Sequence, residues 1–334
     1  MQSIQSRLIN FSIRNRHLLK FRLKREIWDW NTSIPAFREE CEKGARKVKL
    51  TVGITVSPVT IEGLSTGLAA EWIQPSAKAL VREVKDGFIF YTLGGGYVSG
   101  SCSDHRGFVA KFVQGSGVRA LLYEYRLAPE HPFPAALEDT LTAYCWLLAQ
   151  GASPSRIIIA GESAGGGLCL ATLLALRDKG IPLPAAAVAL SPWTDLKLTG
   201  ESHRTRANVA IDPPGMTMVC SQYYAGENDR SLPWISPLYG DLHGLPPLLI
   251  YVGNDELMRD DSTRFVEKAK TAGVRTTLKV GDGMVHCYPL LAPLFPEATQ
   301  AMNEICVYIR TTIGKQEEPM PNPNEHHITK GALK

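Results

Sequence analysis

Short apolar runs alternate with helical patterns along most of the chain. Seven such runs, each bounded by glycine, proline or charged residues, predict strands over Gly67–Ile73, Gly87–Leu93, Arg119–Tyr125, Arg156–Ala160, Ala186–Leu190, Pro247–Val252 and Thr276–Val280. Strands that alternate with helices form parallel sheets with helices on both faces. The pattern therefore predicts an α/β fold with a mostly parallel central sheet.

Helical spacing of apolar residues appears between these runs. It predicts helices over Pro134–Leu148, Leu168–Leu176, Asp261–Ala272 and Glu297–Ile313. The second of them is apolar nearly all round, so we expect it to be deeply buried. The last two are each followed by glycine, the residue that most often ends a helix.

Two long segments do not follow the alternation. Long connections inside compact domains are usually functional or disordered, so we assign residues 1–60 and 195–235 to a helical cap. Residues 61–194 and 236–314 then form the two parts of the main domain. Residues 315–334 are rich in proline and mixed charge, and we expect a disordered tail there.

Composition narrows the class of protein. The chain has 334 residues, 44% of them hydrophobic, which is enough for a sizeable core, and a formal net charge of only +3, which does not indicate a nucleic-acid partner. Its seven cysteines are odd in number and form no C-x-x-C pair, as expected of reduced thiols in a reducing compartment such as the cytoplasm. No apolar run is long enough to span a bilayer.

The first 25 residues have an unusual charge pattern. They contain no acidic residue, and apolar residues are interleaved with seven basic ones: Arg7, Arg14, Arg16, Lys20, Arg22, Lys24 and Arg25. A mitochondrial transit peptide has this composition, and so does a helix that lies on a membrane surface. We favour a third interpretation, a cap helix that packs on the main domain and keeps its basic face in water.

The strongest chemical signal is the segment Gly161-Glu162-Ser163-Ala164-Gly165. It follows a predicted strand and precedes the buried helix, which is the context of a nucleophile elbow. Glycines flank the serine because the turn is too sharp for side chains there. A glycine-rich turn at a helix start also binds phosphates, but no phosphate-loop lysine follows. The segment therefore favours Ser163 as a nucleophile.

A second signal is the segment Leu93-Gly94-Gly95-Gly96-Tyr97, directly after another predicted strand. Consecutive glycines let backbone N–H groups turn toward one point, where they stabilise an oxyanion. A flexible glycine linker is the alternative, but such linkers follow polar stretches rather than strands.

Together these segments resemble the hormone-sensitive-lipase family of α/β-hydrolases. The resemblance extends from about residue 65 to residue 313 and includes Tyr125–Ala135, Ser236-Pro237-Leu238, Val252–Leu257 and Gly283-Met284-Val285-His286. It implies an α/β-hydrolase fold and hydrolysis of carboxylic esters.

The resemblance also implies a catalytic triad. In this fold the triad follows in the order serine, acid, histidine, and Ser163, Asp255 and His286 obey that order. Asp255 and His286 each follow a predicted strand, at the edge where open α/β sheets build their sites. We assign the acid to Asp255 because it matches the family position. Its rivals nearby are Glu256, Asp260 and Asp261.

The oxyanion donors implied by the family are the N–H groups of Gly95, Gly96 and Ala164. One departure is Leu93, which stands where the family has histidine before the glycines. Because leucine cannot make the hydrogen bonds of a histidine, we expect packing to hold the loop. We expect Glu162 to accept hydrogen bonds that brace the elbow and neighbouring loops.

The predicted function is serine-dependent hydrolysis of small to medium carboxylic esters through an acyl-enzyme intermediate. Leu93 motivates one alternative, a related enzyme that performs acyl transfer, elimination or cyclisation. A ligand-binding relative without chemistry is another, although a retained serine and histidine argue against it. No metal or organic cofactor is implied. The expected partner is a small ester, with a second copy of the chain in a homodimer as a family expectation.

Overall fold

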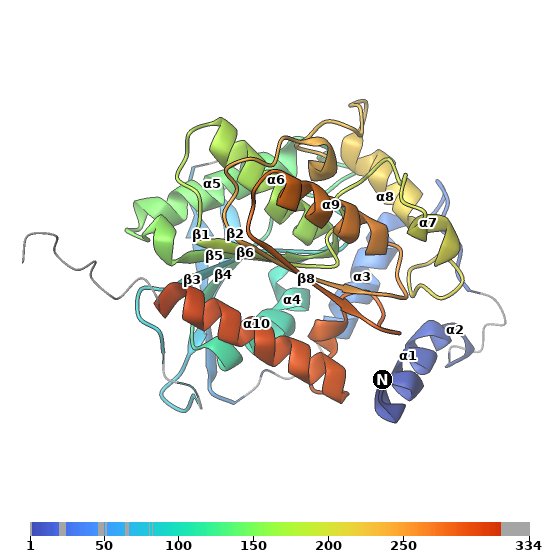
Figure 1. The fold of residues 1–334 in the computed structure, drawn as a ribbon, viewed down its shortest axis with the longest axis horizontal. Helices are drawn as coiled ribbons and strands as arrows, with labels where there is room; N and C mark the ends of the chain where they lie inside the picture. Colours follow the sequence, from blue (N-terminus) through green and yellow to red (C-terminus); the bar gives the residue numbers. More distant parts are fainter. Residues whose placement is uncertain are drawn as a thin grey trace, which may run out of the picture.

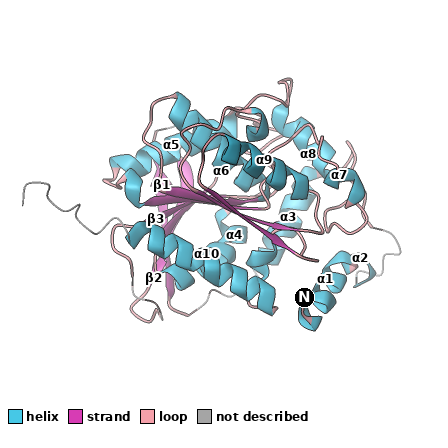
Figure 2. Ribbon diagram, viewed as in Figure 1, coloured by secondary structure: helices cyan, strands magenta, loops and turns pink. Residues whose placement is uncertain are grey.

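A single eight-stranded sheet forms the centre of the protein (Figures 1 and 2). The computed structural model describes residues 2–19, 25–45, 50, 52–63, 67–79, 81 and 83–314, so the predicted tail 315–334 lies outside the described residues. The strands are β1 Ile54–Ile61, β2 Leu68–Pro75, β3 Phe88–Thr92, β4 Arg119–Tyr123, β5 Ile157–Glu162, β6 Ala186–Leu190, β7 Leu248–Gly253 and β8 Thr276–Gly281. They lie in the order β1-β2-β4-β3-β5-β6-β7-β8.

The sheet is mostly parallel, which confirms the predicted α/β architecture. Only the pairs β1–β2 and β2–β4 are antiparallel. The central strands β3, β5, β6 and β7 are buried along their whole length, as expected where helices cover both faces. Strand β1 was not predicted. Residues 54–60, which the sequence analysis assigned to the N-terminal cap, belong to this strand of the sheet.

Helices pack on the two faces of the sheet (Figure 1). One face is covered by α5, α6 and α9, and the other by α4 and α10. Their bounds are α4 Cys102–Ser116, α5 Ala135–Ala149, α6 Ser163–Asp178, α9 Arg259–Thr271 and α10 Pro296–Gly314. Every residue of α6 from Ala164 to Leu176 is buried, so the predicted deep burial of this helix is confirmed.

The two segments that we predict to form the cap lie far apart in the sequence. The first contains α1 Ile4–Arg14, α2 Arg16–Leu19 and α3 Ile34–Ala45, and the second contains α7 Ser202–Thr205 and α8 Met216–Ala225. The N–H of Trp28 donates to the carbonyl of Pro214 at 2.8 Å. Arg25 Nη2 donates to the carbonyl oxygens of Ala210 and Asp212, at 2.5 and 2.8 Å. The two segments are therefore joined to each other.

The carboxyl ends of the parallel strands meet at one edge of the sheet. The glycine run follows β3, Ser163 begins α6 directly after β5, the acidic pair Asp255-Glu256 follows β7, and His286 follows β8. Open α/β sheets bind their ligands at this edge. Among the described helices, none combines the length and the apolar composition needed to cross a bilayer.

Candidate active site

The turn from β5 into α6 holds Ser163 in a left-handed conformation, with φ of 55°. Non-glycine residues rarely adopt this region, and they do so mainly at functional sites. A Cβ added to Gly161 would lie 2.6 Å from the carbonyl oxygen of Gly165, and one added to Gly165 would lie 2.5 Å from the carbonyl carbon of Leu93. Both glycines are therefore required by close backbone approach, as the elbow motif predicts.

The glycine loop after β3 is compact rather than flexible. Gly95 and Gly96 have φ of 104° and 65°, and the carbonyl of Gly95 accepts from the N–H groups of Val98 and Ser99 at 3.2 and 3.0 Å. Within the described part of the chain, no acceptor takes the N–H of Gly95 or Gly96. Ala164 is the second residue of α6, where the helix itself cannot satisfy an N–H. These three donors are available to a ligand.

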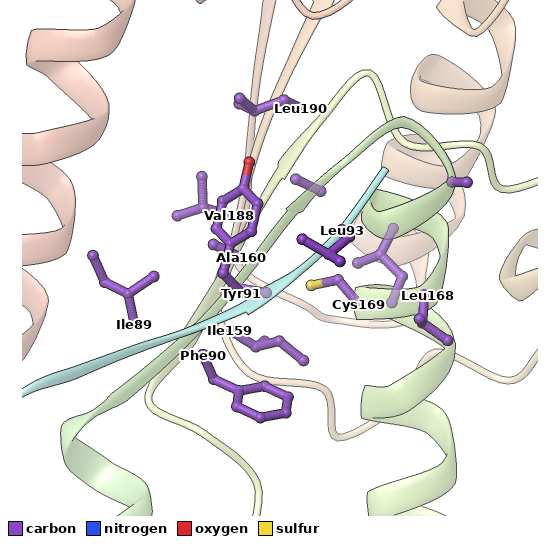
Figure 3. Packing of buried hydrophobic residues seen from close by; sticks show 14 of the residues in the cluster. Ile89, Phe90, Tyr91, Leu93, Ile159, Ala160, Leu168, Cys169, Val188 and Leu190 are labelled. Atoms are coloured by element: carbon purple, nitrogen blue, oxygen red, sulfur yellow. The ribbon is translucent and has the colours of Figure 1, made fainter. Parts of the chain in front are cut away.

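Leu93, the expected departure from the family pattern, lies in the core. Its side chain is fully buried, and Figure 3 shows it on the side of the sheet where Leu168 and Cys169 of α6 lie. Its carbonyl accepts from Tyr125 Oη at 2.8 Å. Packing thus contributes to holding the loop, as predicted, and a hydrogen bond to the backbone adds to it.

Glu162 holds the glycine loop through a hydrogen bond to its backbone. Its Oε1 accepts from the N–H of Gly94 at 2.8 Å and lies 2.7 Å from His105 Nε2. The other ring nitrogen of His105 bonds Asp104. Burial alone would lower the pKa of His105. The neighbouring carboxylates of Glu162 and Asp104 outweigh this effect and raise the pKa to about 10. The imidazolium therefore lies between two carboxylates, and the predicted bracing role of Glu162 is confirmed.

This brace predicts the behaviour of two Glu162 variants. Glu162→Ala removes the acceptor of the Gly94 N–H, so we expect kcat to fall about tenfold with KM within about threefold, because only transition-state donors are misplaced. Glu162→Gln keeps an acceptor oxygen and should recover most of kcat. Steady-state kinetics on p-nitrophenyl butyrate measures both. A rise in KM with unchanged kcat in Glu162→Ala contradicts the positioning role.

His286 lies between β8 and α10, and its carboxylate partner is Glu256. His286 Nδ1 bonds Glu256 Oε2 directly, and the Glu256 side chain is fully buried. Asp255 instead forms an ion pair with Arg14, whose Nη2 lies 2.7 Å from Asp255 Oδ2. The assignment of Asp255 as the acid that orients His286 is therefore wrong. In the turn after β7, the Asp255 side chain points to Arg14 and that of Glu256 to the imidazole.

The other two acidic candidates have structural partners. The Asp260 carboxylate accepts from the N–H of Ser202, and the Asp261 carboxylate accepts from the N–H groups of Thr194 and Asp195.

Ser191 holds the Glu256 carboxylate in place, and sequence reasoning missed it. Its hydroxyl donates to Glu256 Oε1 at 2.7 Å and accepts from the N–H of Cys287 at 2.9 Å. The N–H of Gly253 also donates to Oε1. Ser191 directly follows β6, so its position at the carboxyl end of a strand was the available signal. The bonds of Ser191 link the acid to the residue after His286.

The environment of His286 favours its charged form. Burial lowers the pKa of His286, but the neighbouring Cys287 and Glu256 raise it more. Asp212 adds to this effect, and the pKa of His286 lies well above its ordinary value of 6.5. A general base must be neutral to accept a proton. The raised pKa makes this imidazole a stronger base, but a higher pH is then needed to bring it into its neutral form.

One cavity brings the reactive groups together. It has a volume of about 290 Å³, and Ser163, His286, Gly95 and Gly96 all line it. Most of its other walls are apolar: Phe108, Trp193, Ile211, Met216, Met258, Leu290 and Leu291. Asp212 and Glu162 are charged residues of this lining, and each has one carboxylate oxygen that is buried and without a partner in the described structure. A larger cavity of about 540 Å³ between the two cap segments shares Ile211 with it.

A nucleophilic hydroxyl, a histidine backed by a carboxylate and free backbone donors suit acyl transfer from an ester. Because Nδ1 of His286 bonds Glu256, Nε2 is the nitrogen left for the serine. The described residues contain no group of His, Cys, Asp and Glu placed to hold a metal ion.

Comparison with known proteins agrees with this geometry. A family model described as alpha/beta hydrolase fold matches residues 89–290. The chain is 41% identical over 249 residues to an acetyl-hydrolase of Streptomyces hygroscopicus, covering 74% of this chain and 81% of the relative. It is 36% identical over 222 residues to an esterase of Acinetobacter venetianus, covering 66% and 73%.

Solved structures give the same result over a longer span. An esterase from the bacterial hormone-sensitive lipase family superposes with a TM-score of 0.83 at 39% identity, covering 94% of this chain and 100% of that one. The esterase EstE5, from a crystal soaked in p-nitrophenyl butyrate, has the same score at 38% identity and the same coverage. The chain therefore belongs to the hormone-sensitive-lipase-type family of α/β-hydrolases, the carboxylic-ester hydrolases whose fold it shares.

Proposed function

We propose that this chain hydrolyses small to medium carboxylic esters with Ser163 as nucleophile, His286 as general base and acid, and Glu256 as the orienting carboxylate. The observation that carries the proposal is the shared cavity of Ser163, His286 and the glycine loop, together with the buried His286–Glu256 bond. Glu256 takes the role that the sequence analysis assigned to Asp255.

The acylation step follows from these positions. Ser163 Oγ attacks the ester carbonyl carbon while its proton passes to His286 Nε2. The N–H groups of Gly95, Gly96 and Ala164 stabilise the oxyanion that forms. When the tetrahedral intermediate collapses, the C–O bond to the alcohol breaks and His286 returns its proton to the leaving alkoxide.

Deacylation repeats the same steps with water. His286 takes a proton from a water molecule, whose oxygen attacks the acyl carbon of the acyl-enzyme. The bond to Ser163 Oγ breaks, and the proton returns from His286 to that oxygen. Glu256 keeps Nδ1 protonated throughout and stabilises the imidazolium in both halves of the reaction.

The size of the cavity bears on substrate choice. A volume of about 290 Å³ is at the small end of ligand pockets, which span about 300–1,000 Å³. We expect kcat/KM for p-nitrophenyl butyrate to exceed that for the dodecanoate ester by at least about tenfold, since the longer chain extends beyond these walls. A series of p-nitrophenyl esters measures this, and a profile that rises steadily with chain length contradicts it.

Proton transfer to His286 predicts the pH profile. Only the neutral imidazole accepts a proton, and its pKa is raised, so kcat/KM should rise with pH and reach half its maximum above pH 6.5. Asp212→Asn removes one of the anions that raise this pKa, so its midpoint should move to lower pH. Asp255→Asn is the matched control, because that carboxylate is paired with Arg14. A wild-type midpoint at or below 6.5 contradicts the assignment.

The non-hydrolytic alternatives have less support than hydrolysis. Leu93 motivated them, but the loop that follows it keeps its donors and is held by Tyr125 and Glu162.

The cellular compartment and the oligomeric state of the enzyme are a further part of the proposal. We expect a reducing compartment such as the cytoplasm, since all seven cysteines are free thiols, and we expect a homodimer from the family. Analytical ultracentrifugation measures the latter.

A further inference from the structure

The N-terminal helix α1 attaches to the main domain through polar groups. Gln2 Nε2 and Asn10 Nδ2 both donate to the carbonyl of Gly283, at 3.2 and 3.0 Å. Ser3 Oγ donates to Glu297 Oε2 at 2.8 Å. Together with the Arg14–Asp255 ion pair, these bonds fix the helix beside the loop that contains His286.

The opposite face of α1 presents apolar side chains to solvent. Ile4, Leu8 and Phe11 are 74%, 63% and 65% exposed. Their spacing of four and then three residues places them on one face of a helix. A helix that packs on a globular domain normally buries such a face, but α1 buries Ser6 and Asn10 instead. The cap interpretation therefore explains how α1 is attached, but no residue that the structure describes covers its apolar face.

The basic residues near this apolar face indicate which kind of partner fits it. Seven of the chain's 36 basic residues and none of its 33 acidic residues lie in residues 1–25. Arg7 and Arg16 are exposed on α1 and α2, and Leu18 of α2 is 50% exposed. An apolar helix face flanked by basic residues is the composition of helices that lie in the interface of an anionic bilayer. A second copy of the chain fits less well, because the basic residues of two copies would repel each other.

We propose that α1 is an interfacial anchor that inserts Ile4, Leu8 and Phe11 into the surface of an anionic membrane. The anchor lies on the membrane without crossing it. Since α1 is bonded to Gly283 and Asp255, it holds the loop that contains His286 close to that surface. The proposal goes beyond ester hydrolysis and does not depend on it, because its test measures protein bound to lipid.

Vesicle sedimentation of the full chain tests this proposal. Vesicles of phosphatidylcholine with 30% phosphatidylglycerol should bind the wild-type protein, and vesicles of phosphatidylcholine alone should bind it several-fold less. The double variant Leu8→Ser/Phe11→Ser should reduce binding to the anionic vesicles by at least about tenfold, because two apolar side chains leave the interface. Arg7→Glu should reduce binding mainly at low salt.

The matched control is Leu232→Ser/Val307→Ser, which changes two exposed apolar residues, at 40% and 60%, outside α1 and the residues that bond it. It should bind as the wild type does. Hydrolysis of soluble p-nitrophenyl butyrate should be unchanged in the double variant, which shows that the variant is folded. Equal binding by all variants, or no binding by the wild type, overturns the proposal. So does a dimer that dissociates in Leu8→Ser/Phe11→Ser without any vesicle binding, since the face would then bind a second copy.

Discussion

Ser163→Ala is expected to lower kcat on p-nitrophenyl butyrate by about 10⁵–10⁶-fold. Without the hydroxyl no acyl-enzyme forms, and only binding and the oxyanion donors remain to accelerate attack by water. The variant removes one oxygen from a turn in which the serine backbone is already left-handed, so the fold should persist. Steady-state kinetics measures the effect, with thermal unfolding as the check on folding.

The control for this variant is Ser155→Ala, at an exposed serine in the short 3-10 helix Pro154–Arg156 that precedes β5. Its kcat should match the wild type within about twofold. Activity of Ser163→Ala at more than one hundredth of the wild type would show that another group attacks the ester.

The second large effect distinguishes two adjacent carboxylates. Glu256→Gln should lower kcat by about 10⁴-fold, because the amide cannot stabilise the imidazolium and favours the wrong tautomer of His286. Asp255→Asn should keep kcat within about threefold, since this residue bonds Arg14 of the cap. The two variants each replace one carboxylate by an amide of the same shape, so each serves as the control for the other. A large loss in Asp255→Asn with a small one in Glu256→Gln contradicts the structure-based assignment.

Several features of the fold could be predicted from the sequence because local pattern and tertiary role agree. The strands β3 to β7 are largely apolar runs, and the elbow and the glycine loop follow two of them directly. These motifs depend on backbone geometry, which glycine determines through its missing side chain. The order of the triad along the chain then followed from the family.

Other elements were missed because their signal in the sequence is weak. In β1, Pro58 interrupts an alternating pattern, as edge strands tolerate. Helix α4 buries Val109, Phe112 and Val113 but contains Gly107 and starts with polar residues. Its start is marked by a capping box between Ser101 and Asp104, which is a signal that sequence reasoning had available.

The choice between Asp255 and Glu256 could not be made from composition. Both lie in an irregular turn, where no periodicity indicates which side chain points inward. The outcome depends on Arg14, 241 residues earlier, which pairs with Asp255, and on Ser191, which holds Glu256. The contact between His105 and Glu162 likewise joins two segments that are distant in the sequence. Tertiary structure decides which polar groups become partners, so local pattern does not predict such contacts.

The most direct test of the proposed triad is the rate and site of labelling by an alkyl fluorophosphonate, followed by peptide mapping. The account predicts one phosphonylated residue, Ser163, at a rate that falls at least about 10³-fold in His286→Gln and in Glu256→Gln and stays near that of the wild type in Asp255→Asn. Labelling at another residue, or a rate that depends on Asp255 and not on Glu256, would contradict it.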